Sequence, residues 1–279
     1  MGDHFAAFSF VDRITELSPG RRARGVFAIP PGIAEFPRAL VAEAVGQLAA
    51  WVSMSAIGFR GRPVAALAEQ TRFFAEARPG DALDLCVELT DCDDDAVAYG
   101  GFAEVGGRRV AELSHCLGPM LPCADFDDPA ALSARFELLC GAGASPHRFH
   151  GVAVPPATVG AHEPGVSLRA QLAVPASAPF FADHFPRRAV FPATLLLDAL
   201  MRLATRLAAE RAEAGAAPWT LARMTHVKVR AFTPPGDQLD LEADAQAVDE
   251  STLRVTLGAR RQGKSVATAR VEFGRGGEA

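Results

Sequence analysis

One histidine and two carboxylic acids stand out because their settings favour acid–base chemistry. His184 lies in the loop 179–192, which holds three prolines and has no helical period. Asp198 and Glu43 each lie on an apolar stretch. An imidazole has an ordinary pKa of about 6.5 and can accept a proton near neutral pH. A carboxyl group in apolar surroundings has a raised pKa and can hold a proton. Such residues predict general acid–base catalysis.

The stretches that carry the two acids are predicted to be buried helices. After Pro192 the residues are apolar almost all round a helix, which is typical of a core helix. Ala39, Leu40, Ala44, Val45, Leu48 and Ala49 surround Glu43 in the same way. We therefore expect helices over residues 38–57 and 193–213.

Both helices belong to a repeat that spans most of the chain. "FPRALVAEAVGQLAAWVSM", from Phe36, aligns without a gap with "FPATLLLDALMRLATRLAA", from Phe191. Glu43 falls on Asp198 in this alignment. Both copies continue with Pro-Gly-Asp, Leu-Asp-Leu and alternating segments typical of antiparallel strands. Each unit is thus predicted to be α+β, a curved antiparallel sheet wrapped on one central helix.

The two copies differ in the loop before the helix. Pro30 to Phe36 spans 6 positions, whereas Pro175 to Phe191 spans 16. The first copy therefore lacks about ten residues, among them the counterpart of His184. We expect a first unit over residues 1–120, a linker over 121–150 with a short helix at 129–139, and a second unit over 151–279.

The run "HFPRRAVFPATLLLDALMRL" resembles the signature of the hot-dog-fold β-hydroxyacyl-acyl carrier protein dehydratases. Their pattern is His-Phe-Pro-x-x-Pro-Val-x-Pro-Gly, followed by an apolar helix with Glu or Asp fourteen residues after the His, the spacing of His184 and Asp198. The resemblance covers most of both repeats. The sequence departs from the pattern in four places, which are Ala189 for Pro, Ala193 and Thr194 for Gly-Val, and Arg202 for Gln.

The resemblance implies a fused double hot-dog, an intramolecular pseudo-dimer. In that family each active site joins the His loop of one unit to the acid-bearing helix of its partner. Carried over, His184 would face Glu43 and Gln47, and Asp198 and Arg202 would face the deleted loop. One composite site is then kept and one is lost, unless His184 pairs with Asp198 within its own unit.

The resemblance also implies the reaction and further roles. A β-hydroxyacyl thioester would lose water to give the trans-2-enoyl thioester, with His184 as the base at C2 and Glu43 as the acid at the C3 hydroxyl. The Val190 carbonyl would hold the imidazole tautomer, and Gln47 would be among the residues that bind the substrate. An amide of Ala193 or Thr194 would bind the developing enolate oxygen. No cofactor is implied, because phosphopantetheine carries the substrate.

Composition narrows the partners. The formal net charge of −5 gives no basic footprint for nucleic acid. No uninterrupted apolar run reaches the ~18 residues of a membrane span, and no secretory signal opens the chain. We therefore expect a cytoplasmic protein, with reduced cysteines and without a metal site. Arg187 and Arg188 could meet the phosphate of a pantetheine arm of CoA or an acidic acyl carrier protein.

Several alternatives stay open. His184 could be a solvated loop histidine, and Glu43 an ordinary solvent-facing helix residue. A hot-dog thioesterase would use the acid to position a water, and a non-catalytic hot-dog protein would only bind acyl groups. The expected pathway is fatty acid or polyketide biosynthesis. A homodimer of pseudo-dimers is also open as the oligomeric state.

Overall fold

The computed structural model describes residues 4–212 and 216–275. The first half contains β1 (Arg13–Ser18), β2 (Arg22–Ala28), α1 (Arg38–Ala56), β3 (Gly61–Pro63), β4 (Leu67–Phe73), β5 (Ala82–Cys92), β6 (Ala96–Val105) and β7 (Arg108–Pro122). The connection holds η1 (Cys123–Asp125) and α2 (Pro129–Cys140). The second half contains β8 (Ala157–Glu163), β9 (Ser167–Ala173), η2 (Pro179–Ala182), α3 (Ala193–Glu210), β10 (Thr220–Val229), β11 (Gln238–Ala247), β12 (Thr252–Arg261) and β13 (Lys264–Gly274).

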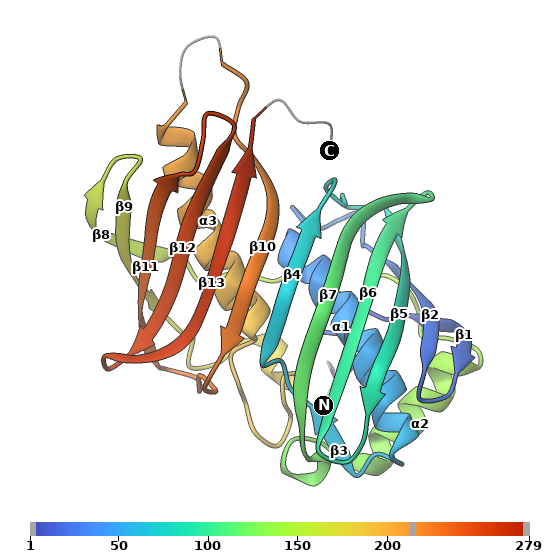
Figure 1. The fold of residues 1–279 in the computed structure, drawn as a ribbon. Coiled ribbons are helices and arrows are strands. Elements are labelled where there is room, and N and C mark those ends of the chain that lie inside the picture. Colours follow the sequence, from blue (N-terminus) through green and yellow to red (C-terminus); the bar gives the residue numbers. More distant parts are fainter. Residues whose placement is uncertain (1–3, 213–215, 276–279) are drawn as a thin grey trace.

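The strands of the two halves form one long antiparallel sheet (Figure 1). Their order is β1-β2-β5-β6-β7-β4-β10-β13-β12-β11-β9-β8, and β3 pairs with β7 off this path. The halves join where β4 pairs with β10, in a register that sets Thr71 opposite Met224. Each half would otherwise leave an open strand edge here, so the seam satisfies the backbone groups of both edges. The expected pseudo-dimer is confirmed as one continuous sheet.

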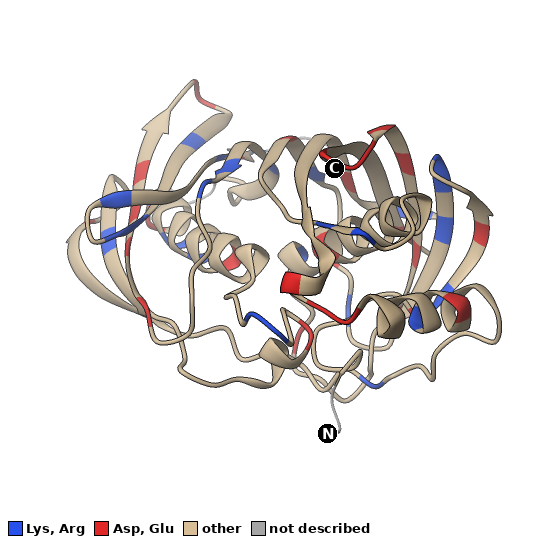
Figure 2. Cartoon of the chain, turned by 90° about the horizontal axis from the view of Figure 1, so that it is seen from below, with Lys and Arg blue, Asp and Glu red and all other residues tan. Residues whose placement is uncertain are grey.

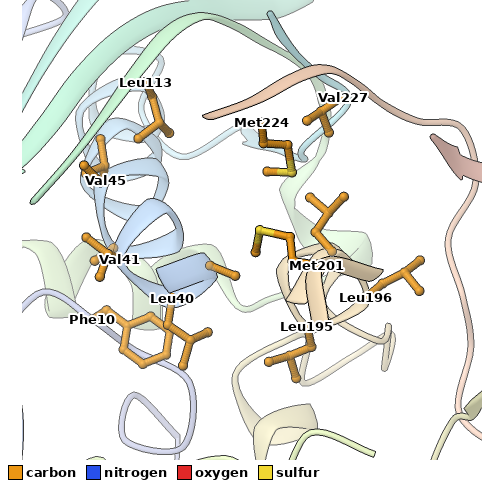
Figure 3. Packing of buried hydrophobic residues seen from close by; sticks show 14 of the residues in the cluster. Phe10, Leu40, Val41, Val45, Leu113, Leu195, Leu196, Met201, Met224 and Val227 are labelled. Atoms are coloured by element: carbon orange, nitrogen blue, oxygen red, sulfur yellow. The ribbon is translucent and has the colours of Figure 1, made fainter. Parts of the chain in front are cut away.

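The central helices α1 and α3 lie on the same side of the sheet (Figure 1). Each helix packs against the strands of its own half. Figure 3 shows that side chains of α1, among them Val41 and Val45, and side chains of α3, among them Leu195 and Met201, belong to one core. α1 is long and apolar enough to cross a membrane by composition alone. It is instead the core helix of the first half, because eleven of its residues are buried against the sheet, α3 and the connection.

The connection between the halves is a packed element. α2 begins at Pro129, and the Asp128 carboxylate accepts a hydrogen bond from the amide of Ala130 as the N-cap. Its apolar side chains Leu132 and Leu139 are buried, and the helix contacts β1 and α1. The helix expected at 129–139 is therefore confirmed.

Charged residues are spread over both halves. Figure 2 shows Lys and Arg interleaved with Asp and Glu. Ion pairs between neighbouring strands, such as those of Glu272 with Arg223 and Arg254, account for part of this pattern. The mixture fits the net charge of −5.

Candidate active site

His184 is fixed by the backbone of its own loop. Its Nδ1 lies 2.8 Å from the carbonyl oxygen of Val190, so Nδ1 carries the hydrogen and Nε2 is left as the basic nitrogen. The amide of Val190 in turn donates to the carbonyl of His184 at 3.0 Å. Burial and, to a smaller extent, the positive charge of the nearby Arg62 lower the pKa of His184 to about 4. The imidazole is therefore neutral near pH 7.

Glu43 is held from both halves of the molecule. Its Oε1 accepts a hydrogen bond from Gln47 on the same helix at 3.0 Å. Its Oε2 accepts one from the hydroxyl of Thr194 at 2.9 Å, and Thr194 belongs to the first turn of α3. Burial raises the pKa of Glu43, against these two hydrogen bonds. Thr194 thus couples the acid of the first half to the helix that follows the His184 loop.

Gln47 is fixed by hydrogen bonds to the backbone of residues 4–12, the N-terminal segment before β1. Its Oε1 accepts from the amide of Phe10 at 2.8 Å, and its Nε2 donates to the carbonyl of Phe8 at 3.0 Å as well as to Glu43. The amide of Phe10 can only donate, so it fixes which end of the Gln47 side chain faces Glu43. Gln47 lies at the site as expected, and in the structure it is a rigid support for Glu43.

A cavity of about 220 Å³ brings these groups together. Its walls come from both halves of the chain. They include His184, Val190, Ala193 and Thr194 of the second half and Glu43 and Gln47 of the first. Apolar side chains of both halves, such as Met54 and Leu196, line the rest. The arrangement suits a ligand with a polar group at one end and a long apolar part.

The start of α3 offers amide donors to this cavity. Ala193 and Thr194 are its first two residues, and within the described residues their amides have no backbone acceptor. Ala193 is not among the residues with positive φ, so alanine carries no backbone strain where the related pattern has glycine.

Asp183, next to His184, was not singled out from the sequence. Its carboxylate accepts hydrogen bonds from the amides of Phe5 and Phe8 and from the hydroxyl of Ser9. These partners lie 174 to 178 residues away, so no local pattern could reveal them. The contacts fasten the N-terminal segment over the His184 loop, and Phe5, Phe8 and Ser9 line the cavity.

Arg62 and Asp127 form a second feature that the sequence did not reveal. Arg62 Nη1 lies 2.6 Å from Asp127 Oδ2, and the side chains are 17% and 2% exposed. Both residues line the cavity. Arg62 comes from the short strand β3 and Asp127 from the connection, 65 positions apart in the chain, so no local pattern shows that they pair.

The counterpart of Glu43 on the second helix has different surroundings. Asp198 Oδ2 accepts from Arg202 at 2.7 Å, and Arg202 also pairs with Glu35 at 2.6 Å. Burial raises the pKa of Asp198, and Arg202 opposes this shift. Neither Asp198 nor Arg202 lines the cavity that holds His184. Glu35 belongs to the shortened loop of the first half. Ion pairs through Arg202 therefore join this loop to Asp198 of α3.

Arg187 and Arg188 are exposed and also have structural partners. Arg187 donates to the carbonyl of Ala124 at 3.0 Å, and Arg188 lies over the rings of Phe126 and Phe232. Their docking role stays a prediction. Within the described residues, no group of three or more His, Cys, Asp or Glu side chains is placed to hold a metal.

Known structures share this architecture over nearly the whole chain. The dehydratase domain of PpsC from Mycobacterium tuberculosis, solved with C12:1-CoA, has a TM-score of 0.52 at 16% identity and covers 96% of this chain and 99% of that one. Acyl-CoA thioesterase II TesB2 from Mycobacterium marinum also has a TM-score of 0.52, at 12% identity, with 95% and 94% covered. The chain is therefore a double hot-dog protein, a fold shared by dehydratases and thioesterases.

Sequence relatives narrow the class. The ApeI-like family (ApeI dehydratase) matches residues 161–270. The 3-hydroxyacyl-(acyl-carrier-protein) dehydratase FabZ of Bacillus velezensis is 33% identical over 128 residues, which cover 41% of this chain and 91% of that protein. By this relative, the chain belongs to the FabZ family of hot-dog dehydratases.

Proposed function

We propose that the protein removes water from a 3-hydroxyacyl thioester to give the trans-2-enoyl thioester. The observation that carries this proposal is the cavity in which His184 of one half and Glu43 of the other meet, with Thr194 bound to Glu43. Membership of the dehydratase family supports the same reaction. The substrate is taken to be bound to CoA or an acyl carrier protein, in fatty acid or polyketide biosynthesis in the cytoplasm.

His184 and Glu43 divide the two proton transfers. Nε2 of His184 accepts the proton from C2, while the Nδ1 contact with Val190 stabilises the imidazolium that forms. The C2 electron pair forms the C2–C3 double bond as the C3–O bond breaks. Glu43, whose pKa is raised by burial, gives its proton to the departing hydroxyl, which leaves as water. His184 then returns its proton through solvent, so both residues regain their starting state.

The helix start stabilises the charge that develops on the thioester oxygen. The amides of Ala193 and Thr194 point along the α3 axis at its N-terminus, where the helix carries partial positive charge. A fixed donor aimed at a developing oxyanion typically contributes about 10²–10³ in rate. The amides can take this role without a movement of the 179–192 loop, because the contact between His184 and Val190 already orders that loop.

Hydrolysis of the thioester is the second candidate. Both oxygens of Glu43 are held by Gln47 and Thr194, and a carboxylate fixed in this way could act as the base for an attacking water. The His184 loop favours dehydration, because hydrolysis has no C2 proton to remove.

One assay separates the functions. The purified chain is incubated with a 3-hydroxyacyl thioester on CoA and on acyl carrier protein, and products are followed by mass spectrometry and by free-thiol titration. Dehydration gives an enoyl thioester and no thiol, and the reverse hydration of the enoyl thioester should also occur. Release of free thiol would instead establish a thioesterase. No turnover with either carrier in either direction would leave an acyl-binding protein.

A further inference from the structure

Arg62 brings a buried positive charge to the wall of the cavity that holds His184. Its guanidinium lies 4.3 Å from the ring centroid of Phe185, and the Phe185 ring stacks on His184 with centroids 4.1 Å apart. Asp127 neutralises it through the 2.6 Å ion pair. The acid–base mechanism above uses neither charge. A buried ion pair costs desolvation free energy, so its place at this cavity calls for a physical reason.

The guanidinium has more donors than the protein satisfies. An arginine side chain carries five N–H groups, and within the described part of the chain Asp127 is the one carboxylate within ion-pair distance of Arg62. Nε is buried with no hydrogen-bond acceptor among the described residues. An unsatisfied buried donor is unfavourable, and a ligand that brings an acceptor would relieve this cost.

The charges around Arg62 select a neutral acceptor. Asp127 already balances Arg62, and two further acids, Glu43 and Asp183, line the same cavity. A ligand carboxylate or phosphate at this point would add negative charge beside an arginine that Asp127 already balances and in a cavity that also holds the ionised Asp183. A carbonyl oxygen accepts the hydrogen bond without adding a charge.

The position of Arg62 indicates which part of the ligand it meets. Ala65 and Leu67 follow it closely in the chain, line the cavity and are exposed, so this segment borders the mouth. On its other side Arg62 contacts Phe185, the neighbour of His184. It therefore lies between the mouth and the reaction centre, where a thioester substrate has its carrier arm rather than its acyl tail.

We propose that Arg62, held by Asp127 and Phe185, binds an amide carbonyl oxygen of the pantetheine arm of the substrate. This assignment rests on the proposed function, because it takes the ligand to be an acyl thioester of a pantetheine-bearing carrier. Arg62 is then a substrate-binding residue that selects thioesters by their arm.

The test compares substrates with and without the arm. The same 3-hydroxyacyl group is supplied as a pantetheine thioester and as a butanethiol thioester, which has no amide. Arg62→Met alone would leave Asp127 buried and unpaired, so the variant used is the double change Arg62→Met/Asp127→Asn. We expect kcat/KM to fall about tenfold or more for the pantetheine substrate relative to the butanethiol substrate, the effect of one hydrogen bond to a charged group.

The matched control is Arg60→Met, which removes a nearby arginine that is 65% exposed and paired with Asp94. Its ratio of the two kcat/KM values should equal that of the wild type. An unchanged ratio in the double variant, whether both activities fall together or neither falls, would overturn the assignment.

A binding measurement keeps the assignment separate from catalysis. S-hexylpantetheine is an unreactive thioether, and calorimetry should show that it binds the double variant about tenfold more weakly than the wild type. Equal affinities, or no binding to the wild type, would contradict the role of Arg62. If the wild type binds the thioether in this Arg62-dependent way yet dehydrates no thioester, the proposed reaction fails while the arm site stands.

Discussion

At the scale of single residues, Glu43 and Asp198 occupy equivalent positions in the repeat, but only Glu43 lines the cavity. Glu43 lines the cavity with His184 and is held by Gln47 and Thr194. Asp198 is instead tied to Arg202 outside it. The repeat alone could not decide between them, because both are acids on apolar helices. The ion pairs around Asp198 favour the composite site.

We expect His184→Ala and Glu43→Gln each to remove most of the proposed dehydratase activity. The double variant should be little worse than either single variant, as is usual for residues that act as a unit. Asp198→Asn should keep turnover within about tenfold of wild type, roughly 1.4 kcal/mol of barrier. Steady-state kinetics checks these values. Thermal melts are needed beside them because Asp198 is buried. An inactive but folded Asp198→Asn beside an active Glu43→Gln would restore the within-unit pair.

The half-buried, neutral His184 should make stability depend on pH. Its pKa is lowered to about 4 in the folded state, below the ordinary value of about 6.5 in the unfolded chain. Between these values the unfolded state binds more protons, so the free energy of unfolding should fall as pH drops from about 6.5 toward 4. Denaturant unfolding should show a weaker fall over this range in His184→Gln than in the wild type.

His4 provides the control of opposite sign. Its hydrogen bond to Asp183 raises the pKa of His4, so His4 stabilises the fold below its unfolded pKa and loses this contribution as pH rises. His4→Gln should therefore make the loss of stability on acidification steeper. The same slope in His184→Gln and the wild type would show that His184 titrates normally.

At the scale of elements, the N-terminal segment is part of the site although it belongs to no helix or strand. Residues 8–10 support Gln47 through Phe8 and Phe10, and Asp183 holds the segment from the other side. The segment thus links the acid helix of one half to the histidine loop of the other. Phe8 and Phe10 anchor the segment in the core, and its backbone hydrogen bonds to Gln47 and Asp183 can each be weakened by a single substitution.

Asp183→Asn should loosen this segment while the sheet stays folded. An amide replaces a carboxylate oxygen as the acceptor for the amides of Phe5 and Phe8, so their hydrogen exchange should speed up. The free energy of unfolding should fall by about 1–3 kcal/mol. Asp249→Asn is the matched control, since Asp249 accepts from Ser251 in an exposed turn. Unchanged exchange at Phe5 and Phe8 would show that the carboxylate does not fasten the segment.

How far the sequence could go depends on the range of each interaction. The helices expected at 38–57 and 193–213 and the strand pairs of both halves follow local periodic patterns, so they were predictable. In the structure the helices end at Ala56 and Glu210, earlier than expected, and residue 213 lies outside the described residues. The roles of Arg62 and Asp183 depend on partners far away in the chain and had no periodic signal. Thr194 was expected only for its amide, because nothing local shows that its hydroxyl reaches Glu43 across the interface.

At the scale of the whole molecule, the two halves depend on each other for both sheet and core. β4 and β10 are inner strands only because they pair with each other. α1 and α3 also contact each other within one core. Separation would expose a strand edge and apolar helix surface in each half.

The fragment 150–279 is therefore not expected to be a folded monomer on its own. Circular dichroism and analytical ultracentrifugation should show an unfolded or aggregated fragment. Expression together with fragment 1–149 should restore a folded heterodimer. A stable monomer of 150–279 with cooperative melting would show that the seam is dispensable.

Fusion of the halves also changes what a single substitution does. In a symmetric dimer of two identical hot-dog chains, every exchange is copied into both equivalent places. Here the first half keeps Glu43 and Gln47, while the second has Asp198 and Arg202 at the same alignment positions. Because the halves are fused, a substitution at one of these positions leaves its counterpart unchanged. The surroundings of Glu43 can therefore be selected for a ligand site, while those of Asp198 are replaced by stabilising ion pairs.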